Sequence, residues 1–250
     1  MVEIEPRFVE RIWGSTDLSP WFEAGGRKIG EVWFPGEELL IKFLFTTENL
    51  SVQVHPDDAY AKRVENSRGK TEMWRVLRAE PGAKIALGFR QAVDREDARK
   101  AAMDGSIMKM LDWREVRPGD TFLIPAGTVH ALGAGLMIAE IQQNSDITYR
   151  LFDYGRGREL HIEKSLDVAD LDPYQERPTR CEYFETEEVE AGRLADPRGS
   201  EDYLIGLESG RVWRLTHAAA SPERSLHTWA PSNEKAPDAI APGAFSSRSV

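Results

Sequence analysis

The chain has 250 residues, and 41% of them are hydrophobic, which suffices for one large domain with a buried core or for one domain with a small appendage. Its 42 acidic and 32 basic side chains give a net charge of −10, which disfavours nucleic acid and anionic membranes as partners. The single cysteine excludes an intramolecular disulfide, and there is neither a basic leader before an apolar stretch nor an apolar run near the roughly 20 residues of a membrane span. We therefore expect a cytoplasmic protein in which an anionic ligand would need a locally basic pocket.

Short segments rich in Val, Ile, Leu, Phe and Thr recur between turn residues, and such segments predict β-strands. So many short strands favour an antiparallel sandwich or barrel. In chain order the predicted strands are residues 39–47, 50–55, 72–78, 84–89, 121–125, 136–142 and 147–152.

Two segments between these strands predict helices. Residues 56–64 begin with Asp57 and Asp58, which favour the first turn of a helix. Residues 94–104 carry acidic side chains before basic ones, the order that a helix dipole favours. We expect both helices to be insertions between strands.

The character of the chain changes after about residue 174. An acidic run is followed by a strand-like piece, and in residues 217–250 Ala, Ser and Pro make up 18 of 34 positions, which is typical of poorly ordered chain. We therefore predict a main β domain at 1–175, a small β segment at 176–216 and a disordered tail at 217–250. The two histidines in this tail, His217 and His227, are assigned no role.

Four side chains suit a single divalent metal ion. Gln53 and His55 are two residues apart in a predicted strand and so share one face of it. Glu72 and His130 follow at separations of 17 and 58 residues, which suits ligands from separate strands of a barrel. Together they offer two nitrogens and two oxygens. The alternative for Gln53 is a structural hydrogen bond at a strand edge, because glutamine is an uncommon zinc ligand.

The segment around His130 resembles a known metal-binding motif. From Gly119 to His130 the chain reads Gly-x5-Pro-x-Gly-x2-His, similar to the second cupin motif, which delivers one histidine into a small β-barrel. Ala134 stands where that motif usually closes with asparagine. This likeness implies a cupin double-stranded β-helix, also called a jelly-roll barrel, here with helical insertions and a truncated C-terminal β segment.

A longer series of motifs resembles type I phosphomannose isomerase of the short bacterial or archaeal kind. In order, these are Trp13-Gly14, Ile29-Gly30-Glu31-Val32-Trp33, residues 51–58, Gly69-Lys70-Thr71-Glu72-Met73-Trp74, residues 125–130 and the block 140–156. The resemblance implies one zinc ion per chain at Gln53, His55, Glu72 and His130, with other divalent ions as alternatives. It also implies a carbohydrate-metabolism enzyme that interconverts mannose 6-phosphate and fructose 6-phosphate, acting as a monomer or homodimer.

The same resemblance implies roles for further residues. Arg150 is implied as the residue most closely tied to catalysis, with Lys70 and Glu140 lining the reactive centre. Moving a proton between C1 and C2 through an enediol-type intermediate requires a general base, for which Glu140 is the first candidate and Lys70 the second. The implied phosphate contacts are Lys42, Ser51 and Arg156.

Structural alternatives and other functions stay open from the sequence alone. Glu140 could be an inward carboxylate paired with an arginine, and Arg150 and Arg156 could form an ion-pair ladder with Asp153. His161 alternates like an edge-strand residue and reads as a surface or packing histidine. The chain has only a fragment of the relatives' second β domain, so the alternatives are a non-catalytic sugar-phosphate-binding metal cupin or another metal-cupin enzyme that uses iron or manganese.

Overall fold

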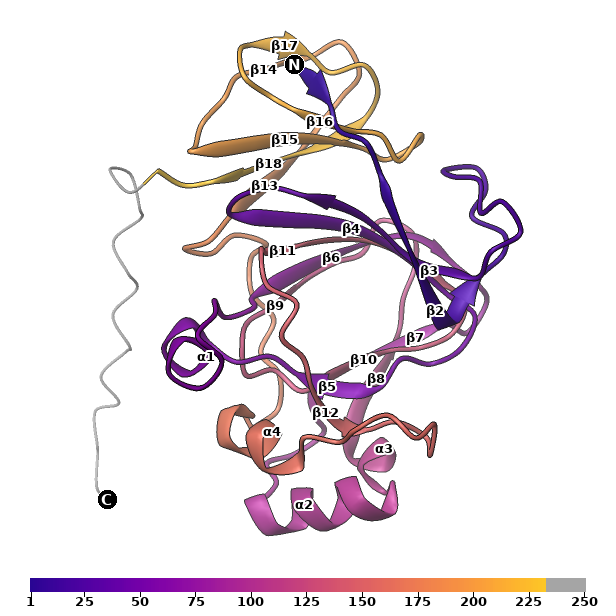
Figure 1. The fold of residues 1–250 in the computed structure, drawn as a ribbon, viewed down its shortest axis with the longest axis vertical. Coiled ribbons are helices and arrows are strands. Elements are labelled where there is room, and N and C mark those ends of the chain that lie inside the picture. Colours follow the sequence, from indigo (N-terminus) through magenta and orange to yellow (C-terminus); the bar gives the residue numbers. More distant parts are fainter. Residues whose placement is uncertain (233–250) are drawn as a thin grey trace, which may run out of the picture.

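Two antiparallel sheets face each other in the main part of the molecule, and a third sheet covers the outer face of one of them (Figure 1). The computed structural model describes residues 1–232. The first sheet has six strands in the order β2 (Arg7–Ser15), β3 (Ile29–Pro35), β4 (Leu39–Thr46), β11 (Leu136–Gln143), β6 (Glu72–Ala79) and β9 (Thr121–Ile124). The second has five, in the order β12 (Tyr149–Phe152), β5 (Val52–Val54), β10 (His130–Leu132), β7 (Lys84–Phe89) and β8 (Leu111–Glu115).

The chain passes from one facing sheet to the other at almost every connection between β4 and β12. This crossing pattern is the jelly-roll arrangement that the cupin resemblance implies. The seven predicted strands and the two predicted helices are confirmed, with ends within two residues of those expected. Asp57 and Asp94 cap helices α1 (Asp58–Glu65) and α2 (Arg95–Asp104), where their side chains accept hydrogen bonds from the backbone N–H groups of Tyr60 and Asp97.

Two further helices were not predicted, α3 (Ile107–Met110) and α4 (Ile162–Val168). With α2 they lie against the outer face of the five-stranded sheet (Figure 1). Their apolar side chains pack there on Val52, Val54 and Phe89. His161 is the residue at the N-terminal end of α4, so the interpretation of its surroundings as an edge strand was wrong.

Strand β11 is buried along its whole length because it is covered on both faces. Met137, Ala139 and Ile141 belong to the apolar layer shared with the third sheet, whereas Leu136 and Ile138 face the space between the two main sheets. Successive side chains of a strand point to opposite faces. Glu140 must therefore lie on the interior face, beside Ile138, and this places a carboxylate inside the barrel.

The third sheet has the order β1 (Val2–Glu3), β16 (Val212–Arg214), β15 (Glu201–Gly206), β18 (Ser225–Ala230) and β13 (Glu185–Val189), and a small pair, β14 (Leu194–Ala195) and β17 (Ala219–Ala220), lies beside it. Residues from this sheet and from the six-stranded sheet form one core, which includes Phe34, Phe43, Phe184, Tyr203 and Leu226. The sheet therefore closes the side of the barrel that lies away from the helices (Figure 1).

The predicted disorder of residues 217–250 is wrong for its first part, because β17 and β18 lie there. Composition concealed a buried strand, in which Leu226 and Ala230 enter the shared core and Thr228 hydrogen bonds to Thr186 of β13 at 2.9 Å. His227 is fully buried, with Nε2 3.0 Å from Asp202 Oδ1, so it has a structural role that we did not expect. The rest of the predicted tail, residues 233–250, lies outside the described residues.

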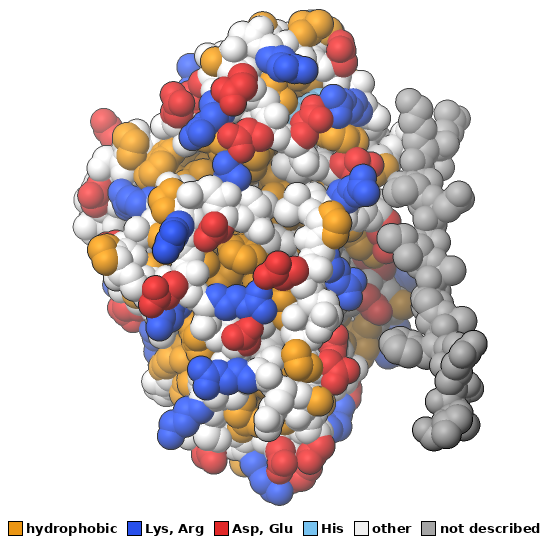
Figure 2. Space-filling model, turned by 180° about the vertical axis from the view of Figure 1, so that it is seen from behind, with side chains coloured by type: hydrophobic (Ala, Val, Ile, Leu, Met, Phe, Trp, Pro, Cys, Tyr) orange, Lys and Arg blue, Asp and Glu red, His pale blue; other side chains and the backbone are white. Residues whose placement is uncertain are grey.

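One face of the molecule carries charges of both signs in close alternation. On the face shown in Figure 2, acidic and basic side chains are interspersed, without one large area of a single sign. In residues 1–232 we find no helix with the length and apolar content that a membrane crossing demands.

Candidate active site

One row of interior side chains crosses the six-stranded sheet. Antiparallel register puts Trp33 of β3 opposite Lys42 of β4, Lys42 opposite Glu140 of β11, and Glu140 opposite Trp74 of β6. Cross-strand partners on one face lie about 5 Å apart, so these four side chains contact in sequence. Lys42 Nζ lies 4.9 Å from the centre of the Trp33 ring and 3.3 Å from Glu140 Oε1, and Trp74 Nε1 donates to Glu140 Oε2 at 2.9 Å.

A second row crosses the facing sheet. Gln53 of β5 is opposite both His130 of β10 and Arg150 of β12. Because β5 lies between β10 and β12, the side chain of Gln53 lies between the imidazole of His130 and the guanidinium of Arg150. The two rows bring two of the predicted ligands, Gln53 and His130, and two of the predicted catalytic residues, Glu140 and Arg150, to the space between the sheets.

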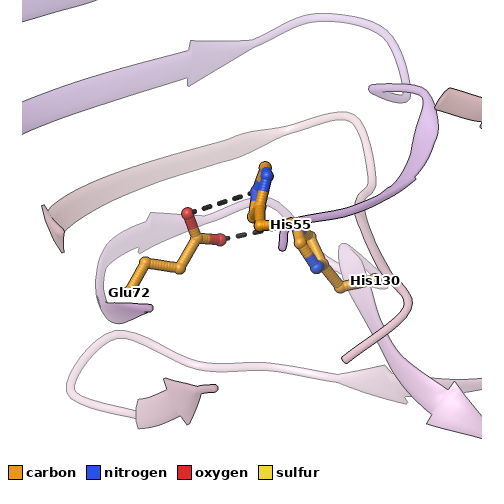
Figure 3. Close-up of side chains that lie close together, drawn as sticks. All are labelled: His55, Glu72 and His130. Carbon is orange, nitrogen blue, oxygen red and sulfur yellow. Dashed lines mark ion pairs between the residues drawn. The ribbon is translucent and has the colours of Figure 1, made fainter. Parts of the chain in front are cut away.

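His55, Glu72 and His130 converge in this space (Figure 3). Each is at most 1% exposed, and their potential ligand atoms all lie within 4.8 Å of one another. Glu72 Oε2 is 3.6 Å from His55 Nε2, and Glu72 Oε1 is 3.4 Å from His130 Nε2. Three of the four predicted ligands are therefore close enough to share one ion.

The hydrogen bonds around these residues leave their inner atoms open for a metal. His55 Nδ1 lies 2.8 Å from the carbonyl oxygen of Ile147, and His130 Nδ1 lies 2.9 Å from that of Thr128, so each Nδ1 carries the proton and each Nε2 presents a lone pair. His55 Nε2 and Glu72 Oε1 are buried without a hydrogen-bond partner among the described residues, and Glu72 Oε2 has only Lys70 Nζ near it, at 2.9 Å. Buried polar atoms without partners are rare, and a divalent cation would satisfy both. The residues present therefore fit a metal ion.

Gln53 lies at the edge of this cluster. Its Nε2 is 3.2 Å from His130 Nε2, and its Oε1 accepts a hydrogen bond from Ser51 Oγ at 3.2 Å. Turning the amide by half a revolution would exchange the two atoms and direct the oxygen to the side of His130. Gln53 can thus complete the ligand set without backbone movement, which keeps its predicted role as a proposal.

Burial dominates the protonation of the cluster. It lowers the pKa of His55 well below its ordinary value and that of His130 to about 4, so both imidazoles are neutral, as metal ligation requires. Burial, followed by repulsion from Glu140, raises the pKa of Glu72 to about 7. A cation between these three residues would therefore restore the charge on Glu72.

Two buried lysines share the neighbouring carboxylates. Lys70 Nζ is 2.9 Å from Glu72 Oε2 and 4.0 Å from Glu140 Oε1. Burial would lower the pKa of Lys70, but Glu72 and Glu140 outweigh it and the pKa is raised. Burial and then repulsion from Lys70 lower the pKa of Lys42. Burial would raise the pKa of Glu140, but Lys70 and Lys42 outweigh it, so the net shift is downward and Glu140 is held as a carboxylate.

A cavity of about 660 Å³ is lined in part by Gln53 and Lys70, which contact His130 and Glu72 of the three-residue cluster. Six of its lining side chains are Lys or Arg and four are Asp or Glu, so the lining is basic in an acidic protein. It therefore supplies the locally basic pocket that an anionic ligand requires. The predicted residues that line it are Gln53, Lys70, Glu140, Lys42, Ser51, Arg150 and Arg156.

The two predicted arginines differ in their partners. Arg156 donates to Glu48 Oε2 at 2.9 Å and to the carbonyl of Asn49 at 2.8 Å, whereas Asp153, the partner in its structural alternative, is 3.8 Å away. Arg150 forms no ion pair with a carboxylate in the described part of the chain, and its Nε is buried without an acceptor there. Glu140 pairs with lysines and not with an arginine, unlike its structural alternative.

Among the other residues that line the cavity are five to which sequence reasoning assigned no catalytic or binding role. Glu31 and Trp33 stand two apart in a motif that was noted only for its resemblance. His161 was predicted to be a surface or packing residue, but it forms two hydrogen bonds with the backbone of Arg150. Its backbone N–H donates to Arg150 O at 2.8 Å, and its Nδ1 accepts from Arg150 N at 3.2 Å. No periodic pattern marks the remaining two. The five are Arg11, Glu31, Trp33, Arg158 and His161.

Comparison with known proteins identifies the relatives of this chain, although no family model matches it. The chain is 35% identical over 223 residues to the mannose-6-phosphate isomerase ManA of Bacillus subtilis, a match that covers 70% of each protein. It is 36% identical over 214 residues to the probable mannose-6-phosphate isomerase GmuF of the same organism, covering 67% of this chain and 68% of the relative.

Solved structures agree with these relatives. The crystal structure of the mannose 6-phosphate isomerase from Bacillus subtilis superimposes with a TM-score of 0.73 at 24% identity, over 91% of this chain and 98% of the other. A mannose 6-phosphate isomerase bound with zinc and yttrium gives a TM-score of 0.68 at 13% identity, over 92% and 99%. These likenesses confirm the predicted cupin fold, and the sequence identities show that this chain belongs to the mannose-6-phosphate isomerase family.

Proposed function

We propose that this protein interconverts mannose 6-phosphate and fructose 6-phosphate through an enediol-type intermediate. One observation carries the proposal: a buried cluster of two histidines and a glutamate lies beside a basic cavity that is lined by Glu140, Lys70 and Arg150. Aldose–ketose interconversion needs a proton carrier and stabilisation of charge on two adjacent oxygens, and these residues offer both.

The proposed cofactor is one zinc ion, held by His55, Glu72 and His130 with the amide oxygen of Gln53 as fourth ligand. Support for zinc comes from the ligand types and from the zinc-bound isomerase of the same fold, and other divalent ions are the alternatives for this site. When bound, the ion supplies Lewis-acid polarisation of the sugar oxygens at C1 and C2.

Glu140 is the proposed proton carrier. Its lowered pKa keeps it ionised at neutral pH, and its Oε1 faces both lysines at the cavity wall. In this proposal the carboxylate removes the proton from C2 of the aldose and returns it to C1, while the C1 oxygen gains a proton and the C2 hydroxyl loses one; the reverse reaction follows the same steps backwards. Lys70, with a raised pKa and an ion pair to Glu72, is suited to donate a hydrogen bond to a sugar oxygen rather than to accept a proton.

Arg150 is proposed to stabilise the negative charge that develops on the substrate oxygens. Its guanidinium lines the cavity and has no carboxylate partner in residues 1–232, so its charge is available to a ligand. Lys42 and Ser51 are the proposed contacts to the sugar phosphate from the wall of the cavity. The cytoplasmic location and the monomeric or homodimeric state stay predictions.

A coupled assay for fructose 6-phosphate tests the function directly. Metal-replete protein is expected to form product from mannose 6-phosphate, and a chelator that removes the metal is expected to abolish it. No product from metal-replete protein would refute the isomerase activity. Full turnover after complete removal of metal would refute the role of the metal but leave the activity.

A further inference from the structure

Arg150 lies on a strand that has a neighbouring strand on one side only. β12 is at the edge of the five-stranded sheet, next to β5, so on its outer side no strand of the described chain pairs with its backbone. The register with β5 shifts between Arg150 and Phe152, and such a shift interrupts the ladder of hydrogen bonds. The pairing with β5 therefore does not by itself fix the backbone that follows Arg150.

The side-chain contacts of Arg150 do little to hold its guanidinium in place. Its Nε is buried without an acceptor among residues 1–232, and its only side-chain hydrogen bond there is a long one, 3.4 Å, from Nη1 to the carbonyl of Glu159. The preceding residue, Tyr149, packs with Leu166 of α4 in the outer apolar layer, so Arg150 points to the opposite face, towards the cavity. The direction of the guanidinium thus depends on how the backbone of Arg150 is held.

His161 holds this backbone at two points. Its own N–H donates to Arg150 O at 2.8 Å, and its ring Nδ1 accepts from Arg150 N at 3.2 Å, so one residue takes the place of a neighbouring strand. Because Arg150 N–H supplies the proton of the second bond, the proton of the neutral imidazole is on Nε2. Burial and then repulsion from Arg150 lower the pKa of His161, so at neutral pH Nδ1 keeps the lone pair that this bond uses.

The helix that follows does not explain why position 161 carries a histidine. His161 is the N-cap residue of α4, a position that favours serine, threonine, aspartate and asparagine, and its side chain forms no capping hydrogen bond. In the described part of the chain its ring makes one hydrogen bond, the one from Arg150 N, and its Nε2 lies 3.9 Å from Glu159 Oε2. The helix itself is held in place, because Leu166 is buried and its carbonyl accepts from Arg95 of α2 at 2.6 Å. A fixed helix end therefore carries the side chain that holds Arg150.

We propose that His161 is a positioning residue for Arg150: it completes the outer edge of β12 and so directs the guanidinium at the reacting oxygens of the substrate. The inference rests on the proposed function, because the catalytic role of Arg150 belongs to that function. It assigns His161 no contact with the sugar. The effect of His161 should therefore appear in kcat and depend on the presence of Arg150.

Substitutions at position 161 that keep or lose the acceptor test the hydrogen bond. Asparagine carries Oδ1 at the same number of bonds from Cα as histidine carries Nδ1, whereas glutamine places its oxygen farther out and leucine has no acceptor. In the metal-loaded, full-length protein, His161→Gln and His161→Leu should lower kcat about 10- to 100-fold and change KM less than about threefold, the effect of displacing a catalytic group by about 1 Å. His161→Asn should keep kcat within about threefold of the wild type.

The double variant His161→Leu/Arg150→Ala tests whether the effect passes through Arg150. Its kcat should lie within about threefold of that of Arg150→Ala alone, because a residue that only positions Arg150 then has nothing to position. Arg95→Ala is the control for loosening of α4, since Arg95 donates to Leu166 O and to Asp167 at the other end of the helix. It should lower the melting temperature and leave kcat within about twofold of the wild type.

Amide hydrogen exchange, measured by NMR, gives a result that does not require turnover. The N–H of Arg150 should exchange about 10- to 100-fold faster in His161→Leu and His161→Gln than in the wild type and His161→Asn, because its acceptor is lost. Wild-type kcat in His161→Leu, equal losses in His161→Asn and His161→Leu, multiplied losses in the double variant, or unchanged exchange at Arg150 would each overturn the inference. If the wild type forms no fructose 6-phosphate, the proposed function fails, and the exchange rates alone decide whether His161 holds Arg150.

Discussion

Lys42 and Glu140 oppose each other directly on β4 and β11, with the lysine Nζ 3.3 Å from Oε1 of the glutamate. This pairing, together with Lys70, keeps Glu140 ionised, and an ionised carboxylate is what a proton carrier must be before it acts. The lysines thus set the charge state of the residue that we propose moves the proton.

Glu140→Gln should therefore lower kcat by about 10²- to 10⁴-fold, the usual loss when a general base is removed. The metal content, measured by elemental analysis, should stay at the wild-type level, because Glu140 is not a predicted ligand. Glu10→Gln is the matched control, since Glu10 lines the same cavity and its side chain has no described partner. A kcat within a few fold of wild type in Glu140→Gln would transfer the role to another group.

Arg150→Ala should lose turnover by about 10²- to 10³-fold, as when a donor to a developing oxyanion is removed. Arg150→Lys keeps the charge but not the planar fork, so it should recover only part of the loss. Steady-state kinetics on protein of verified metal content would measure this. Near-normal turnover in Arg150→Ala would remove it from the catalytic residues.

Metal removal should lower thermal stability as well as turnover, because the ion would bind the folded chain and not the unfolded one. At a free metal concentration 100 times its Kd, metal binding adds about 2.7 kcal/mol to the free energy of unfolding. Scanning calorimetry with zinc and with chelator measures the difference. In His130→Gln the zinc-dependent rise in melting temperature should be largely lost. His227, which is buried in β18, provides the control: in His227→Gln the rise should persist even if the melting temperature without zinc falls.

Glu201 joins the third sheet to the barrel, and its effect should depend on pH. Its carboxylate accepts from the backbone N–H groups of Glu37, Glu38 and Leu39, at the turn before β4, and from the hydroxyl of Tyr203. Glu201→Gln should lower the free energy of unfolding by about 2 to 3 kcal/mol, since one amide cannot accept at both positions. The exposed Glu208→Gln serves as the control, with no expected change.

The direction of the pH effect follows from the pKa of Glu201. Burial would raise this pKa, but the Tyr203 hydroxyl and the backbone donors outweigh it, so it lies below its ordinary value of 4.5. The stabilisation is then complete above pH 4.5 and declines as the pH falls through the lowered value. Melting temperatures of wild type and Glu201→Gln should converge in that acidic window, and a constant difference would contradict the assignment.

Local patterns predicted the strands and ligands that lie in regular structure. The pair Gln53 and His55 was predictable because period two puts them on one face, and both helices begin at aspartates that cap them. Lys42 and Glu140 also carried a signal, since each is the only charged residue of its strand. Their mutual contact was not predictable, because register between distant strands is decided by tertiary pairing.

The turn residues and the C-terminal strand could not be read in the same way. Arg158 and His161 reach the cavity from an irregular segment, where no period relates sequence to direction. Strand β18 was hidden by its small residues: Ser225 and Thr228 are buried by neighbouring strands on both sides rather than by their own hydrophobicity. Residues 176–216, which we predicted to be a remnant of a second small β domain, contain β15, the central strand of the third sheet.

The double burial of β11 limits how this protein can change over evolutionary time. Ala139 and Ile141, the neighbours of Glu140 in sequence, pack in the apolar layer that the barrel shares with the third sheet. The strand therefore tolerates neither an insertion nor a deletion. A shift of one residue would carry Ala139 or Ile141 to the reactive centre and drive a carboxylate into the apolar layer under the third sheet. The sequence of this strand can therefore change only by substitution. A substitution on its outer side can alter turnover although the changed side chain does not contact the sugar.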